Sequence, residues 1–104
     1  MYLTNTEQLP GKTITECMGV VSGSTVRAKH AGRDIMAGLK NLVGGELRGY
    51  TELLSEARDE AMNRMIDQAT QLGANGVVNI RFSTSSVAAG ASEIYVYGTA
   101  VVVK

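Results

Sequence analysis

Hydrophobic residues between positions 50 and 72 recur at steps of three and four, with charged and polar residues between them. The apolar members of this repeat are Tyr50, Leu53, Leu54, Ala57, Ala61, Met62, Met65, Ile66, Ala69 and Leu72. Residues at these steps share one face of a helix, so the pattern predicts a long amphipathic helix over 50–72. Gly73 is expected to end it, because glycine readily adopts the left-handed conformation that follows many helices.

A shorter repeat of the same kind lies earlier in the chain. Its apolar members are Ala31, Ile35, Leu39, Leu42 and Val43, and they predict a first helix over 31–43. Gly32 and Gly38 lie inside this segment, and each costs about 1 kcal/mol of helix stability relative to alanine. Such glycines indicate close packing against another backbone, from this chain or from a neighbouring subunit. Gly44-Gly45 is expected to end the helix.

Three other stretches, 13–21, 77–83 and 93–103, alternate between two sets of side chains in the manner of β-strands. Small residues over 84–91 predict a loop between the last two strands. The order strand, helix, helix, strand, strand predicts one α+β domain over the whole chain. Its sheet is expected to be mainly antiparallel and packed on the two helices.

The first strand illustrates what alternation predicts for individual side chains. Met18 and Val20 are expected on one face of this strand, and Cys17 and Val21 on the other. Cys17 would then be a small, buried apolar residue, which is the usual environment of an unpaired cysteine.

The last strand is apolar or aromatic on both faces. One face carries Ile94 and Val96, and the other carries Tyr95, Tyr97 and Val101. A strand of this kind needs a cover on each side. One face is expected to pack on the helices, and the other is expected to meet a second copy of the chain. The sequence therefore predicts a homo-oligomer with Tyr95, Tyr97 and Val101 at the subunit interface.

Composition narrows the possible partners. Ten Lys/Arg balance ten Asp/Glu, and the chain has no Trp and one Phe, so neither a basic nucleic-acid surface nor an aromatic stacking platform is expected. No signal peptide and no apolar run long enough to span a membrane is apparent, and we expect no membrane partner. Cys17 is the only cysteine, which excludes an intramolecular disulfide and agrees with a cytoplasmic location.

A series of short motifs runs through the chain in a fixed order. The series is Gly19-Val20-Val21, Arg33-Asp34, Gly44-Gly45 followed by Tyr50, Ala57-Arg58 with Ala61, Gly73-Ala74-Asn75-Gly76-Val77-Val78, and Gly98-Thr99-Ala100-Val101. Together these motifs resemble the YbjQ-like family of small bacterial and archaeal proteins, labelled "putative heavy-metal-binding". The resemblance implies a dodecin-like β/α subunit that assembles into a ring-shaped homopentamer. It implies no activity.

The chain offers few ligands for a metal ion. Cys17 and His30 are the only cysteine and histidine, they stand thirteen positions apart, and neither belongs to a paired metal-binding motif. A closed zinc site uses about four such ligands, so one subunit cannot build it from these two residues. A ring could gather one ligand from each chain, and Cys17 and His30 are the candidate ligands for a divalent transition metal.

An anion site is the alternative. Arg27, Lys29 and Arg33 cluster where the first helix is expected to begin, and the free N–H groups of a helix start favour negative charge. A phosphate or carboxylate would suit this segment. A solvated basic edge, or ion pairing with nearby acidic residues, would account for the same residues without a ligand.

The remaining charged residues of the family series favour structural roles. Arg33, Asp34 and Arg58 are expected to form salt bridges at subunit boundaries. Cys17 with His30 lacks a third group to orient a nucleophile, so no enzyme is predicted. The sequence thus favours a homo-oligomeric metal-binding or assembly module of unknown biochemical role, with a binder of a small anion as the alternative.

Overall fold

The computed structural model of the chain describes residues 1–28, 48–88 and 91–104. The predicted first helix and the Gly44-Gly45 stop lie outside these residues, as do Lys29, His30, Arg33 and Asp34.

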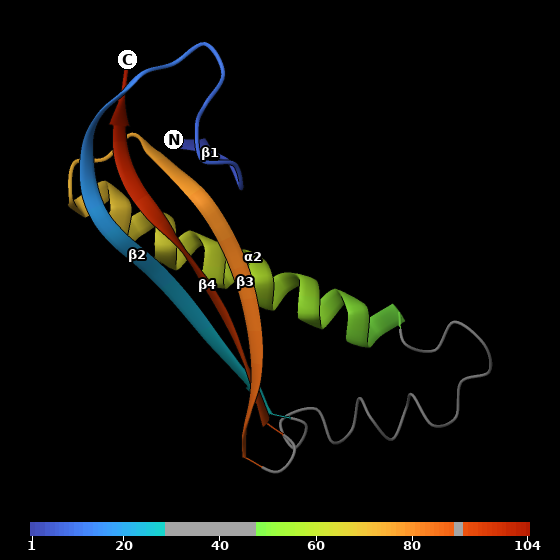
Figure 1. Cartoon of the computed structure of the whole chain (residues 1–104). Coiled ribbons are helices and arrows are strands. Elements are labelled where there is room, and N and C mark those ends of the chain that lie inside the picture. Colours follow the sequence, from blue (N-terminus) through green and yellow to red (C-terminus); the bar gives the residue numbers. More distant parts are fainter. Residues whose placement is uncertain (29–47, 89–90) are drawn as a thin grey trace, which may run out of the picture.

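Within the described residues, four strands form one mixed sheet (Figure 1). They are β1 (Tyr2–Leu3), β2 (Ile14–Ala28), β3 (Gly76–Ala88) and β4 (Ala91–Val103). The order across the sheet is β1-β3-β4-β2, with β1 parallel to β3 and the other neighbours antiparallel. The α+β class and the mainly antiparallel sheet are thereby confirmed, and β4 is a central strand as its two apolar faces require.

The loop predicted over 84–91 is wrong, because most of it is strand. β3 continues to Ala88 and β4 begins at Ala91, with Thr84 opposite Ile94 and Ser85 opposite Glu93. Small hydroxyl residues are compatible with a strand when a partner strand supplies backbone hydrogen bonds on one side. The pattern of small residues does not reveal this pairing, so the segment resembled a loop.

The long helix α2 (Arg48–Gln71) confirms the amphipathic repeat. It crosses one side of the sheet, mainly over β2 and β4 (Figure 1). Gly73 ends it in the left-handed conformation, with φ at +86°, and the Ala74 N–H donates to the Ala69 carbonyl at 3.1 Å. This arrangement satisfies carbonyl groups that the last helical turn would otherwise leave without a donor.

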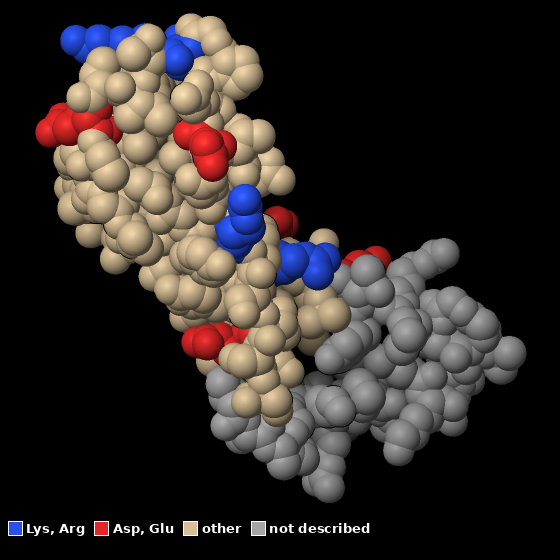
Figure 2. Space-filling model, viewed as in Figure 1, with Lys and Arg blue, Asp and Glu red and all other residues tan. Residues whose placement is uncertain are grey.

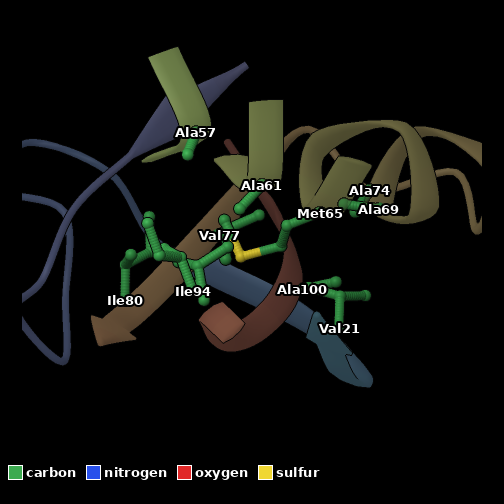
Figure 3. Packing of buried hydrophobic residues seen from close by; sticks show 11 residues of the cluster. Val21, Ala57, Ala61, Met65, Ala69, Ala74, Val77, Ile80, Ile94 and Ala100 are labelled. Atoms are coloured by element: carbon green, nitrogen blue, oxygen red, sulfur yellow. The ribbon is translucent and has the colours of Figure 1, made fainter. Parts of the chain in front are cut away.

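The main core lies between α2 and the sheet. Figure 3 shows Ala57, Ala61 and Met65 of the helix facing the apolar side chains of the strands. The sheet contributes Val21, Val77, Ile80, Ile94, Val96 and Ala100. Alanines on the helix and Gly23 on β2 allow a very close approach, because a Cβ atom at Gly23 would lie 2.1 Å from the carbonyl oxygen of Ala61.

A second, smaller core lies on the other side of the sheet. The segment after β1 folds back, so that Leu9 packs on Val78, Val101 and Val103. Val101 is 2% exposed in the single chain. Its burial therefore needs no second subunit. The expectation that this side of β4 must meet a second copy of the chain does not hold at Val101.

Four register shifts interrupt the pairing of the long strands, and two of them change which residues share a side of the sheet in its middle. The pairing of β2 with β4 shifts between Cys17 and Gly19, and the pairing of β3 with β4 shifts between Val78 and Arg81. Gly19 has φ at +104° and Asn79 at 56°, values that suit glycine and asparagine. Such bulges add a residue to one strand and invert the alternation that follows.

The prediction that Met18 and Val20 share a face is wrong for this reason. Met18 packs against the core under α2, whereas Val20 is 74% exposed and lies opposite Thr99. Val21, the next residue, lies under the helix.

Candidate functional site

The side of the sheet turned away from α2 is only partly covered by Leu9. The uncovered part carries Cys17, Val20, Ser22, Ser24, Tyr95 and Tyr97, and we call it the open face. The tyrosines come from the central strand β4, and the other four residues come from β2.

The two tyrosines lie side by side because they are two positions apart on one strand. Their ring centroids are 5.6 Å apart, with an angle of 30° between the ring planes. Ser22 pairs with Tyr97 and Ser24 with Tyr95 on one flank, while Arg81 and Ser83 pair with the same tyrosines on the other. Tyr97 is 38% exposed.

The open face is uncharged over all six of its residues. In Figure 2, seen with α2 behind the strands, neutral residues cover most of the surface over the sheet. Flat aromatic rings with hydroxyl tips beside an exposed valine can bury apolar area and still form hydrogen bonds. This chemistry suits contact with another protein surface better than it suits catalysis.

Cys17 is exposed, and the prediction of a buried cysteine is wrong. Its opposite residue Val101 is covered by Leu9, whereas Cys17 itself is left exposed. The thiol is therefore accessible. Within residues 1–28, 48–88 and 91–104, no group of three or more His, Cys, Asp or Glu side chains could hold a metal ion.

The structure does not bring the other predicted ligands together with Cys17. His30 lies outside the described residues, so the proposed pairing with Cys17 stays a prediction. The same is true of the anion site, since Lys29 and Arg33 are not described and Arg27 is placed only as a residue of β2. Arg58 is exposed on α2, and its role at a subunit boundary also stays a prediction.

Sequence reasoning missed two polar residues of α2 that contact β2. The Ser22 N–H donates to Oε1 of Gln68 at 2.7 Å, and Nη1 of Arg64 donates to the Ser24 carbonyl at 2.5 Å. Nη2 of Arg64 also donates to Glu60 at 2.6 Å. Their positions in the sequence could have indicated these contacts, because Arg64 and Gln68 are four residues apart and lie beside the buried apolar residues of the helix.

Asn75, which belongs to the motifs that carry the family resemblance, has a structural role. Its Nδ2 donates to the Val103 carbonyl at 2.9 Å, and its Oδ1 accepts from the Val103 N–H at 2.8 Å. These two bonds fasten the connection after α2 to the end of β4.

Gly98 in the last motif is also structural. A Cβ atom there would lie 2.7 Å from Cγ1 of Val77. Asn75 and Gly98 therefore have roles in folding, and these roles account for the two residues without a ligand.

No helix within the described parts of the chain is long and apolar enough to cross a membrane.

Comparison with protein families gives a match over the full chain. Residues 1–104 match the model of a YbjQ family described as "Putative heavy-metal-binding". A UPF0145 protein of Hahella chejuensis is 65% identical over 104 residues, covering 100% of both chains. A UPF0145 protein of Acinetobacter baylyi is 67% identical over 96 residues, covering 92% of this chain and 89% of that protein. An archaeal relative from Archaeoglobus fulgidus is 60% identical over 101 residues, covering 97% and 94%.

A solved structure shares the fold. It is the crystal structure of a protein of unknown function of the DUF74 family from Pediococcus pentosaceus, with a TM-score of 0.66 and 18% sequence identity. The likeness covers 100% of this chain and 98% of that chain. At this identity it supports the fold alone.

Proposed function

The chain belongs to the YbjQ-like family, and from this premise we propose that it is the subunit of a homo-oligomer whose binding sites form between copies. The supporting observation is the open face, where Val20 is 74% exposed beside the stacked tyrosines. Burial of apolar surface favours association by roughly 25 cal/mol per Å². The six residues of the open face are uncharged and add little desolvation cost to that gain, and the charged Arg81 lies opposite Tyr97 at its border.

A ring of five copies is the assembly that the family resemblance implies. The open face would supply one half of each subunit contact, with Tyr95 and Tyr97 as its aromatic centre. Aromatic residues are common at the energetic centres of interfaces, because they bury a large area and lose little side-chain entropy. Val101 would act indirectly, by holding β4 in place under Leu9.

We propose a soft divalent transition metal as the ligand of such an assembly. Each chain contributes one exposed thiol at Cys17, which is a residue of the open face. A thiolate binds zinc and softer metals well, but a closed site takes about four ligands. The site would therefore be shared, with Cys17 from several copies and, within the same hypothesis, His30.

Metal content and assembly mass measured together test this proposal. The untagged protein is loaded with Zn²⁺ or Cd²⁺, dialysed, and examined by native mass spectrometry and elemental analysis. We expect fewer than one metal ion per chain in a homo-oligomer. Cys17→Ser should lose the metal and keep the mass. Metal content that is unchanged in Cys17→Ser, or absent from the loaded wild type, would contradict the metal assignment.

A non-catalytic role and a cytoplasmic location belong to the same proposal. An accessible single thiol is stable in a reducing compartment and prone to oxidation outside it. The anion hypothesis for Arg27, Lys29 and Arg33 has no supporting contact among the described residues, so we keep it as the outcome to test if the loaded protein holds no metal.

A further inference from the structure

Strand β2 is an edge strand, and side chains of helix α2 contact its backbone. In the order β1-β3-β4-β2 of the described strands, this 15-residue strand pairs with β4 alone. Edge strands of this length present unpaired N–H and C=O groups, which can pair with a strand of another molecule. Residues 20–25 contain no charge and no proline, and half of them are β-branched, a composition that favours such pairing.

The backbone groups that helix α2 contacts belong to this outer edge. Alternate residues of an antiparallel strand direct their N–H and C=O groups to the same side. The Ser22 N–H and the Ser24 carbonyl are bonded to α2 side chains, so both point away from β4. Gln68 and Arg64 therefore occupy the positions that the backbone of an added strand would take.

The surrounding geometry favours these two contacts. Gly23, between the two serines, lets the helix backbone approach so closely that a Cβ atom would meet the Ala61 carbonyl at 2.1 Å. Glu60 holds the other nitrogen of the Arg64 guanidinium at 2.6 Å. Gln68 lies one helical turn after Arg64, a spacing that lets the two side chains reach the Ser22 N–H and the Ser24 carbonyl, respectively.

The opposite edge of the sheet is covered differently. There the chain itself pairs with β3, because the Thr4 N–H donates to the Val77 carbonyl and the Ile80 N–H donates to the Thr4 carbonyl. Backbone covers part of one edge, and side chains cover part of the other. Only the side-chain cover can be removed by substitution while the strand stays in place.

We propose that Arg64 and Gln68 are a guard on β2 that prevents the β2 strand of a second copy from adding to this edge. The guard directs contact between copies away from edge pairing, and it leaves the open face available. The inference concerns a different surface from the proposed subunit interface. It holds whether the wild type is a monomer or a ring, because it predicts a difference between variant and wild type.

The test compares Arg64→Ala/Gln68→Ala with two controls. Arg64→Lys/Gln68→Glu keeps a donor and an acceptor at the same positions. Asp67→Ala/Gln71→Ala removes two exposed side chains of the same helix, each three residues after one of the guard residues. Amide hydrogen exchange is measured on dilute protein, and mass and thioflavin fluorescence are measured as concentration rises. Circular dichroism reports whether each variant is folded.

We expect exchange of the Ser22 amide to quicken about tenfold in Arg64→Ala/Gln68→Ala, since its acceptor is lost. At higher concentration this variant should form β-rich assemblies larger than the wild type, with new protection at Ser22. Both controls should match the wild type. Three outcomes would overturn the guard: unchanged exchange, faster exchange without added association, or association that leaves Ser22 unprotected. If the double variant does not fold, the single variant Gln68→Ala is judged by the same criteria.

Discussion

Val20 and Val21 are the same residue type, adjacent on one strand, and they lie on opposite sides of the sheet. Val21 is 1% exposed under α2, whereas Val20 is 74% exposed on the open face. The chain's own helix thus covers Val21 on one side of the sheet, whereas Val20 on the other side is left uncovered. Val21 is therefore buried by the folding of one chain, whereas Val20 lies where we expect copies of the chain to associate.

The largest expected effect comes from the covered part of the far side. Val101→Asp places an unpaired carboxylate beneath Leu9, where burial of a charge costs several kcal/mol. We expect the chain itself to unfold, as measured by circular dichroism and chemical denaturation. Thr13→Asp adds the same charge at an exposed position and should remain folded. A folded Val101→Asp chain of unchanged stability would show that Leu9 does not close this region.

Gly23→Ala should have the next largest effect, because it acts on the contact between β2 and α2. The new methyl would overlap the helix backbone at Ala61 and Met65, and overpacking of this kind costs roughly 3 kcal/mol. Urea denaturation measures the change in the free energy of unfolding. Ser24→Ala, on the other side of the same strand, should change it by less than about 0.5 kcal/mol. Equal values for the two variants would mean that α2 does not lie this close to β2.

Substitutions of the adjacent residues Val20 and Val21 should have smaller effects on stability, and they compare the two sides of the sheet directly. Val21→Ala should lower the free energy of unfolding by about 2 kcal/mol at every protein concentration, because it acts within one chain. Val20→Ala should matter only as far as copies associate, so its effect should grow with concentration. Thermal unfolding over a hundredfold range of concentration separates the two. An effect of Val20→Ala that is independent of concentration would contradict the proposed role of the open face.

Much of the helix-covered side could be predicted from the sequence. The three-and-four repeat correctly placed Ala57, Ala61 and Met65 in the core, and Gly73 correctly ended the helix. Both signals are local, since they depend on residues within one or two turns. The alternation of β4 was equally readable, because this strand contains none of the bulged residues.

The open face could not be predicted in detail, for reasons that are not local. The bulge at Gly19 inverted the alternation of β2, so Cys17 and Val20 share a side of the sheet, whereas strict alternation predicts them on opposite faces. Leu9 covers Val101 from far along the chain. Coverage of a residue such as Tyr97 depends on distant segments of the chain or on other copies of the chain. The residues next to it in the sequence do not specify either of these.

The native mass of the untagged wild type, measured beside Tyr97→Asp, tests the central claim most directly. Tyr97 is 38% exposed, so the single chain can accept the charge, and circular dichroism would confirm that it stays folded. We predict a homo-oligomer of five copies for the wild type and a folded monomer for Tyr97→Asp. A monomeric wild type, or an oligomer of the same mass in the variant, would contradict the assignment of the open face as the surface through which copies of this chain meet.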